Sequence, residues 1–199
     1  YMASLLLRAF LMEKKMSPIN KEQLKSILNA IPKCNVRYFL NGLYVNFDKK
    51  EIVATNGHVL VLIENVDFLD GVGEVIIPRE TISNLIKISS KKGKVKITNS
   101  EICIDDVVLS YEPIKGKYPD FRKVMPTKQI PYENSRFCWF SSEYVKLVED
   151  MSKAFELNFT FYPPDDNSSS PLELFGVSDD LEITVVLMKF KIDVYGKDK

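Results

Sequence analysis

Histidine and cysteine, which supply most catalytic bases, nucleophiles and metal ligands, are scarce in this sequence. One histidine and three cysteines occur among 199 residues. The cysteines, Cys34, Cys103 and Cys138, are far apart and form no C-x-x-C pair. This spacing argues against a disulfide framework and against a zinc site, and it favours a reducing cytoplasm.

Patterns that would indicate an enzyme are also missing. A cysteine nucleophile would need His58 as its base, but no pattern places an orienting carboxylate beside that histidine. The pair Asp165-Asp166 lies between two prolines and a serine-rich run, which predicts an exposed loop rather than a metal site. The segment Gly71-Val72-Gly73 is too short for a phosphate-binding loop and precedes a strand. We therefore expect no catalytic activity, no metal and no cofactor.

Neither an excess of one charge nor a long apolar run is present. Lys and Arg together number 27, as do Asp and Glu, so any contact with nucleic acid must depend on where the charges lie. The apolar run Leu5 to Met12 is interrupted by Arg8 and is far shorter than the ~20 residues that span a bilayer. It also lacks a basic leader and a cleavage site, so we expect no membrane association. The hydrophobic content of 45% is enough for a substantial core.

Helix and strand patterns are clear from residue 20 onward. Asn20 and Gln23 form a capping-box pattern, and apolar residues follow at helical spacing as far as Ile31, before Pro32. Three β-rich runs come next: Val36 to Phe47, Glu51 to Thr55 and Val59 to Val66. The pairs Asn41-Gly42 and Asn56-Gly57 predict hairpin turns.

The same order of elements recurs twice. The second copy has a strand, a helix and three strands at Glu74 to Arg79, Glu80 to Ile88, Lys94 to Thr98, Glu101 to Asp105 and Val107 to Tyr111. The third has them at Arg136 to Phe140, Ser141 to Phe155, Leu157 to Phe161, Leu172 to Val177 and Leu181 to Ile192. The repeating unit is β-α-β-β-β, which predicts an α+β fold with antiparallel sheets.

Four segments of the first two copies resemble a known family. They are Val36-Arg37-Tyr38-Phe39-Leu40-Asn41-Gly42, Ala54-Thr55-Asn56-Gly57-His58, Val75-Ile76-Ile77-Pro78-Arg79 and the segment from Gly116 to Pro126. In the same order they are similar to V-R-Y-x-L-N-G, A-T-D-G-H, V-I-V-P-R and G-x-F-P-D-Y-R-x-V-x-P. Those motifs belong to the middle domain of the bacterial DNA polymerase III beta subunit, the sliding clamp.

The third copy resembles the second half of the last domain of the clamp. Phe140-Ser141-Ser142-Glu143-Tyr144-Val145 is similar to its F-N-x-x-Y-V helix start, and the segment from Val185 to Ile192 to its C-terminal V-V-M-P-M-R-L. The resemblance implies the DNA-clamp fold, with helices lining the inner face of a ring and curved antiparallel sheets outside. It predicts an N-terminal extension at 1–13, a two-unit clamp-like domain at 14–126 and a half domain at 127–199.

In a clamp, the polar faces of these helices would face DNA. The lysines concerned are Lys21, Lys25, Lys87, Lys91, Lys92, Lys146 and Lys153. Lysines held around a duplex attract phosphates without reading bases, so the resemblance implies loose, non-specific binding of double-stranded DNA. The solvated face of any amphipathic helix also carries lysines, and glutamates such as Glu22 and Glu149 dilute the positive potential.

The resemblance also implies a cleft that takes a hydrophobic linear motif of a polymerase or repair protein. One wall would contain Arg37, Phe39, Leu40, Thr55, Gly57, His58 and Leu60, and the other Ser141, Tyr144, Val186, Met188, Phe190 and Lys191. Apolar walls with a few polar rim groups suit an extended peptide. Taken singly, Phe39, Leu40 and Leu60 fit an ordinary strand core better than a peptide-binding wall. Asn56, Val59 and Lys189 stand where the family has Asp, Arg and Pro.

These observations predict a non-enzymatic DNA replication accessory protein, acting as a processivity factor or as a docking platform for polymerase and repair proteins. The resemblance also implies a clamp loader as a partner. The alternative is an interaction module that does not encircle DNA and that regulates or diverts replication proteins. Because each chain supplies one and a half domains, we expect a homo-oligomer, a dimer at least, and a tetramer would supply a full ring. The third unit has no partner unit in the same chain, so its strand edge would be exposed. If the run Leu5 to Met12 covers that edge, we expect a monomer instead.

Overall fold

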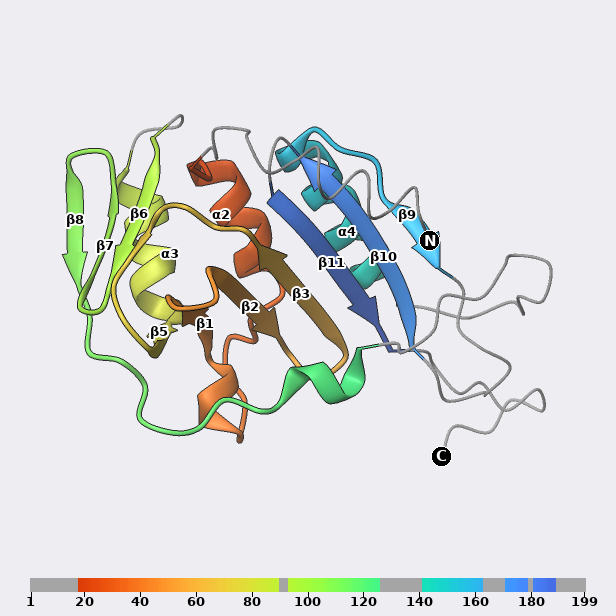
Figure 1. Cartoon of the computed structure of the whole chain (residues 1–199), viewed down its shortest axis with the longest axis horizontal. Helices are drawn as coiled ribbons and strands as arrows, with labels where there is room; N and C mark the ends of the chain where they lie inside the picture. The colour runs from red at the N-terminus through yellow and green to blue at the C-terminus, as the bar shows by residue number, and fades with distance from the viewer. Residues whose placement is uncertain (1–17, 90–92, 126–140, 163–170, 179–180, 189–199) are drawn as a thin grey trace.

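The computed structural model describes residues 18–89, 93–125, 141–162, 171–178 and 181–188. In this part of the chain, three α-helices, two 3-10 helices and eleven strands form an α+β fold (Figure 1). No helix among these residues is long and apolar enough to cross a membrane. The run Leu5 to Met12, the pair Asp165-Asp166 and the predicted strand Arg136 to Phe140 lie outside the described residues.

The first unit begins with helix α2 (Lys21–Leu28). The predicted capping box is present, because the Asn20 side chain accepts from the amide of Gln23 at 3.0 Å and the Gln23 side chain accepts from the amide of Asn20 at 2.7 Å. The remaining elements are the 3-10 helix η2 (Tyr38–Leu40) and strands β1 (Gly42–Asn46), β2 (Glu51–Thr55) and β3 (Val59–Glu64).

The predicted strand Val36 to Phe47 is wrong in its first half. The Asn35 side chain accepts a hydrogen bond from the amide of Arg37 at 2.9 Å, and the Asn41 side chain donates one to the Asn35 carbonyl at 3.1 Å. These local bonds compete with strand pairing and hold a compact loop instead. Asn41-Gly42 therefore leads straight into β1 and makes no hairpin, whereas Asn56-Gly57 does turn the chain from β2 to β3 as predicted.

The second and third units follow the predicted order with small shifts. The second contains β4 (Leu69–Asp70), β5 (Glu74–Pro78), α3 (Arg79–Ile88), β6 (Val95–Thr98), β7 (Glu101–Ile104), β8 (Val107–Ser110) and the 3-10 helix η3 (Phe121–Val124). The third contains α4 (Ser142–Phe155), β9 (Thr160–Tyr162), β10 (Leu172–Ser178) and β11 (Leu181–Leu187). The sequence patterns did not predict β4 or η3, and β9 starts later than expected.

Two sheets organise these strands. A seven-stranded sheet has the order β5-β1-β2-β3-β11-β10-β9 with antiparallel neighbours, and a four-stranded sheet has the order β4-β6-β7-β8, in which the β4–β6 pair is parallel. The larger sheet joins the first and third units, because β3 pairs with β11 from Glu64 opposite Glu182 to Val59 opposite Leu187. The predicted domain boundary at residue 126 stays a prediction. The larger sheet contains strands from both sides of that boundary.

Helices α2, α3 and α4 lie on one side of the larger sheet (Figure 1). Alternate residues of β2 face this side, where Ile52 and Ala54 join a large core with the helices, while Val53 faces the opposite side. Burial on both faces explains why β1 to β3 are nearly continuous apolar runs.

A second, smaller core covers the face of the larger sheet away from the helices. It contains Leu40, Tyr44, Val53, Leu60, Leu62, Ile76, Tyr118, Phe121 and Val186. Residues 111–125, here called the strap, cross this face after β8 and contribute Tyr118 and Phe121 to the core. The strap appears in green below the larger sheet in Figure 1.

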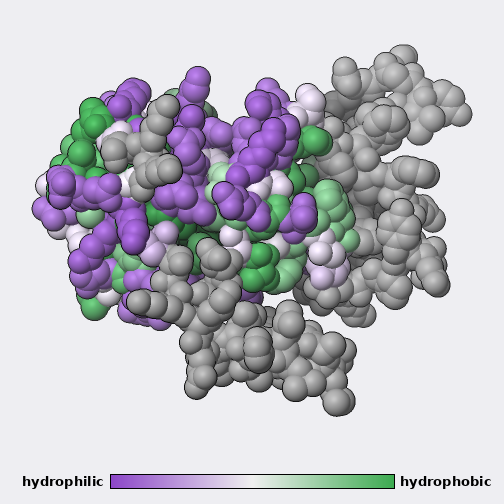
Figure 2. All heavy atoms as spheres, turned by 90° about the horizontal axis from the view of Figure 1, so that it is seen from above, coloured by the Kyte–Doolittle hydropathy of each residue, from purple (hydrophilic) through white to green (hydrophobic). Residues whose placement is uncertain are grey.

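The surface seen in Figure 2 is mostly hydrophilic among the described residues. Hydrophobic side chains gather at the left end, where Figure 1 places β7 and β8. Val108 of β8 has 51% of its surface exposed. Among the described strands, β8 has a neighbour on one side only.

Candidate functional site

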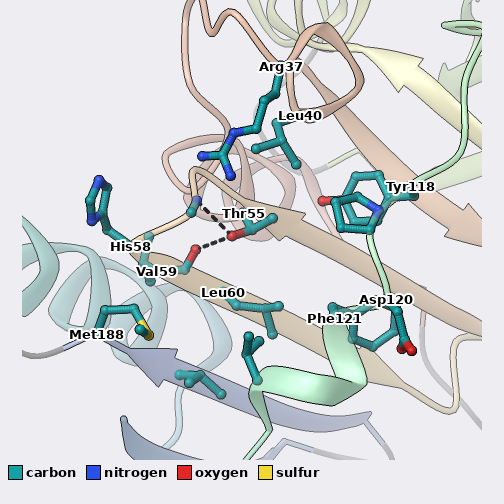
Figure 3. Close-up of a pocket in the computed structure, with 14 residues that line it drawn as sticks. Arg37, Leu40, Thr55, His58, Val59, Leu60, Tyr118, Asp120, Phe121 and Met188 are labelled. Carbon is teal, nitrogen blue, oxygen red and sulfur yellow. Dashed lines mark hydrogen bonds between the residues drawn. The ribbon is translucent and has the colours of Figure 1, made fainter. Parts of the chain in front are cut away.

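A cavity of about 180 Å³ opens beside the second core. Three parts of the chain meet there: the loop and hairpin of the first unit, the strap, and the end of β11. The lining residues are Arg37, Leu40, Thr55, Gly57, His58, Val59, Leu60, Tyr118, Pro119, Asp120, Phe121, Val124, Val186 and Met188. In Figure 3, Arg37 and His58 lie at one end of this pocket, and Asp120 and Phe121 lie across from them.

The hairpin between β2 and β3 is held by its own polar side chains. The Thr55 hydroxyl donates to the carbonyl of Val59 at 2.6 Å and accepts from the amide of Gly57 at 3.0 Å, as the dashed lines in Figure 3 mark. The Asn56 side chain accepts from the amides of His58 and Val59 at 2.9 and 3.0 Å. This closed network fixes the turn that carries His58 to the pocket rim.

The loop before β1 brings Arg37 against this turn. Gly57 has φ of +92°, and a Cβ atom at that position would lie 2.6 Å from Nη2 of Arg37. The guanidinium of Arg37 therefore occupies the space that a side chain at position 57 would fill. Leu40, which follows in η2, is buried and lines the pocket floor.

The strap forms the opposite wall by stacking aromatic rings on the sheet. Tyr118 stacks on Tyr44 of β1, with ring centroids 4.7 Å apart and planes at 23°. Phe121 meets the same Tyr44 ring edge-on, at a centroid distance of 6.1 Å. Each such aromatic pair stabilises the fold by about 1 kcal/mol beyond the contribution of burying the rings. Packing therefore holds this wall against the sheet.

The third wall comes from the third unit. Val186 in β11 is buried, and Met188 just after this strand is 36% exposed at the rim. The amide of Met188 donates to the carbonyl of His58 at 2.8 Å, which extends the β3–β11 pairing into the turn. The pocket therefore exists only where the first and third units meet.

The structure brings many of the residues predicted for the peptide-binding cleft together around this cavity. Of the predicted set, Arg37, Leu40, Thr55, Gly57, His58, Leu60, Val186 and Met188 line it, and Phe190 and Lys191 lie outside the described residues. Three predicted residues do not line it. Phe39 packs against the second core, Ser141 caps α4 by accepting from the amide of Glu143 at 3.3 Å, and Tyr144 lies with its ring centroid 6.5 Å from that of His58.

The strap residues were missed as pocket residues. Tyr118, Pro119, Asp120, Phe121 and Val124 of the strap line the cavity without having been predicted to do so, as does Val59 of β3. The signal was present in the segment from Gly116 to Pro126, which carries one of the family motifs. Nothing in that motif alone tells which sheet face the segment covers.

Burial shapes the chemistry of the tyrosines beside the pocket. The Tyr118 hydroxyl is buried and has no hydrogen-bond partner among the described residues. Burial, with a smaller effect from Tyr44, raises the pKa of Tyr118 above its usual range. Tyr44 donates a hydrogen bond to Glu74 at 2.5 Å, and burial together with this bond raises its pKa to about 12. Both hydroxyls therefore stay protonated at neutral pH.

The predicted DNA-facing lysines that the structure describes have partners. Lys21 donates to the carbonyl of Ser89, and Lys87 to the side chain of Asn84. Lys25 pairs with Glu22, Lys146 with Asp150 and Lys153 with Glu149, at 3.7, 3.2 and 2.5 Å. Lys91 and Lys92 lie outside the described residues.

Within helix α4, acidic residues outnumber the basic ones. It carries Glu143, Glu149 and Asp150 against Lys146 and Lys153. The hydrogen bond between Lys153 and Glu149 lowers the pKa of the glutamate and raises that of the lysine. The polar faces of the helices are therefore close to neutral, rather than strongly positive. Within the described residues, no group of three His, Cys, Asp or Glu side chains could hold a metal ion.

Comparison with known families matches residues 18–120 to the model of the DNA polymerase III beta subunit, central domain. The sequence is 27% identical over 144 residues to the beta sliding clamp of Caulobacter vibrioides (strain NA1000 / CB15N), covering 64% of this chain and 39% of the relative. It is 27% identical over 159 residues to the beta sliding clamp of Chlamydia pneumoniae, covering 71% and 42%. The chain thus spans about two-fifths of the length of these relatives.

Solved clamp structures have the same fold. The H. pylori beta clamp in complex with diflunisal matches with a TM-score of 0.61 at 15% identity, covering 90% of this chain and 66% of that one. The DNA polymerase III subunit beta from Pseudomonas aeruginosa matches with a TM-score of 0.57 at 17% identity, covering 90% and 68%. These likenesses confirm the DNA-clamp fold. Since the central-domain model matches more than half of the sequence, the chain belongs to the family of the DNA polymerase III beta subunit, the bacterial sliding clamp.

Proposed function

We propose that this protein is a clamp-like docking platform in DNA replication, which binds a short hydrophobic peptide segment of a polymerase or repair protein. The observation that carries the proposal is the pocket between the first and third units. Its walls are mainly apolar, from Leu40, Leu60, Phe121, Val124 and Val186. The function requires no catalysis, and we place it in the cytoplasm, where replication proteins meet the chromosome.

The pocket has the chemistry to hold an extended peptide by its side chains. Apolar anchors fit between the hairpin and the strap, where they remove apolar surface from water. The rim carries the positive charge of Arg37, next to His58, at one end and the negative charge of Asp120 at the other. The Helicobacter pylori beta clamp, which shares the fold with a TM-score of 0.55, has been solved bound to a DNA ligase peptide. A linear motif of that kind is the partner we propose.

The clamp role on DNA requires assembly of several chains. In this proposal, a homo-oligomer encloses double-stranded DNA non-specifically, a clamp loader opens it, and docked enzymes gain processivity. The lysines of α2, α3 and α4 would then face the duplex.

A second function is favoured by the near-neutral helix faces. Three of the lysines proposed to face DNA are paired with acidic side chains on the same helix. Such pairs reduce the positive potential that draws DNA to a protein surface. The pocket is independent of these lysines, so the chain would still bind replication proteins as an interaction module that does not encircle DNA.

A peptide titration tests the docking function. Anisotropy of a labelled hydrophobic clamp-binding peptide should rise with protein concentration, and Leu60→Ala or Met188→Ala should each weaken binding by about 1 kcal/mol or more, as expected for anchor contacts. Val108→Ala, which shortens an exposed apolar side chain on the other sheet, serves as the control and should leave the affinity unchanged. Equal affinities for all three variants, with folding intact, would place the binding site elsewhere.

A further inference from the structure

The strap makes polar contacts with both sheets, beginning with Tyr111, which donates to the carbonyls of Thr98 and Ser100. The amide of Ile114 donates to the carbonyl of Ile76 in β5 at 2.9 Å. Tyr118 adds ring stacking, but its hydroxyl makes no hydrogen bond among the described residues. Arg122 in η3 makes a further polar attachment to the larger sheet.

Arg122 reaches a carboxylate that is otherwise shut off from water. Its guanidinium forms an ion pair with Glu51 of β2, whose side chain is 2% exposed, and lies 3.7 Å from Glu64 of β3. A buried carboxylate is tolerated only when a positive group or several donors compensate for its lost hydration. The buried charge of Glu51 is therefore compensated only while the strap keeps Arg122 beside it. The same ion pair holds the strap against β2.

The same guanidinium touches the pocket wall. Its carbon Cζ lies 5.2 Å from the ring centroid of Phe121, in a cation–π arrangement. Phe121 lines the pocket, as do Val124 on the same short helix and Asp120 just before it. Arg122 itself does not line the pocket. One side chain thus links a buried charge in the sheet to the orientation of the wall that a peptide would meet.

We infer that Arg122 is a positioning residue for the pocket: by pairing with buried Glu51 it holds the strap, and with it Phe121, in the conformation that receives a peptide. The inference deepens the proposed docking function and rests on it for the part that concerns peptide affinity. The part that concerns the strap stands on the ion pair alone. A wall ordered before binding spares the peptide the cost of ordering it, so the ion pair raises affinity without touching the ligand.

Hydrogen exchange measured by mass spectrometry separates a local from a general effect. Arg122→Gln should speed exchange in residues 112–125 by about tenfold or more, because opening of the strap becomes easier, while β1 to β3 keep their protection. Arg122→Lys keeps the positive charge but lacks the planar guanidinium with its several donors, so it should retain part of the protection. Lys115→Gln removes an exposed charge from the same strap and should exchange like the wild type.

Peptide binding then tests the functional half. Arg122→Gln should weaken binding of the labelled hydrophobic peptide by about tenfold, Arg122→Lys by less, and Lys115→Gln not at all. Glu51→Gln, which removes the partner charge and leaves Arg122 in place, should lower both protection and affinity in the same direction as Arg122→Gln. Met188→Ala, at the exposed rim and outside the second core, should weaken peptide binding without changing strap exchange.

Three results would overturn the inference. Unchanged strap exchange in both Arg122→Gln and Glu51→Gln would show that the ion pair does not hold the strap. Faster exchange spread equally over β1 to β3 would make Arg122 a general stabiliser rather than a positioning residue. A looser strap with unaltered peptide affinity would separate the strap from the pocket. If the wild-type protein binds no peptide, the docking function fails, and the exchange data alone still decide whether Arg122 orders the strap.

Discussion

The backbone amide of Met188 donates a hydrogen bond of 2.8 Å to the carbonyl of His58. This bond joins the end of β11 to the turn between β2 and β3, so two parts of the chain 130 positions apart share one pocket rim. The proposed site depends on that junction, because Val186 and Met188 complete the walls built by the first unit and the strap.

Gly57→Ala should damage both the fold and the pocket. A φ of +92° is unfavourable for alanine, and the new Cβ would lie 2.6 Å from the Arg37 guanidinium. We expect a loss of about 1–2 kcal/mol in the free energy of unfolding, measured by urea denaturation, together with weaker peptide binding. Gly73→Ala is the matched control, because Gly73 also has a positive φ, of +70°, but has nothing within 4 Å. It should lower stability without affecting the peptide; equal peptide affinities for the two variants would contradict this account.

Tyr118→Phe should leave the protein as stable as before, or stabilise it by about 1 kcal/mol. The substitution removes a buried hydroxyl that has no hydrogen-bond partner among the described residues while keeping the ring that stacks on Tyr44. Tyr44→Phe should instead lower the stability, because it deletes a hydroxyl that is hydrogen-bonded to Glu74 and Asn46. Thermal unfolding of the two variants gives the comparison, and a marked loss of stability in Tyr118→Phe would mean that its hydroxyl has a partner.

Alkaline pH should destabilise the protein through Tyr44. Its pKa in the folded state is about 12, above the ordinary value of 10.0. The folded protein therefore holds this proton more tightly, so the stabilisation is complete below about pH 10 and is lost as the pH rises toward 12, by about 1.4 kcal/mol per pH unit. Urea unfolding at several pH values in this window should show a shallower decline for Tyr44→Phe than for the wild type. Tyr38→Phe, at an exposed position, should keep the wild-type slope.

Neutralising acids on α4 should strengthen any binding of DNA. Glu149→Gln combined with Asp150→Asn frees Lys153 and Lys146 from their ion pairs. We expect roughly threefold to tenfold tighter binding of a DNA duplex at low salt, with a steeper dependence on salt concentration. Glu101→Gln combined with Asp106→Asn makes the same charge change away from the helices and should have a smaller effect. If neither pair of substitutions changes DNA binding, the helices do not face DNA, and the interaction module becomes the better function.

Assembly in solution should exceed one chain. Among the described strands, β8 and β9 stand at sheet edges, and an edge strand exposes backbone groups that favour pairing with another chain. Light scattering across a concentration series should therefore show a dimer or a larger closed assembly. A mass that stays at 22.8 kDa at all concentrations would reject a ring made of this chain alone.

Much of the fold could be predicted from local sequence patterns, and the resemblance to the clamp family supplied candidate residues for the site. The capping box at Asn20, the strand Glu51–Thr55 and the turn at Asn56-Gly57 were all predicted, because each depends on neighbours a few positions away. The prediction failed at 36–41, where asparagine side chains compete with strand pairing for the same backbone groups. A β-propensity count does not register that competition.

The sequence by itself determined the order of most helices and strands and the resemblance to the family, because these follow from short motifs and from the spacing of apolar positions. That resemblance also named many of the residues that the structure brings together around the cavity. Only the tertiary structure decided that the strap covers the outer face of the sheet, that β3 pairs with β11, and that Arg122 meets Glu51. The β3–β11 pairing joins Val59 to Leu187, and the ion pair joins residues 71 positions apart. Their formation depends on which buried surfaces and charges fit together in space, and the local period of a sequence carries no record of that fit.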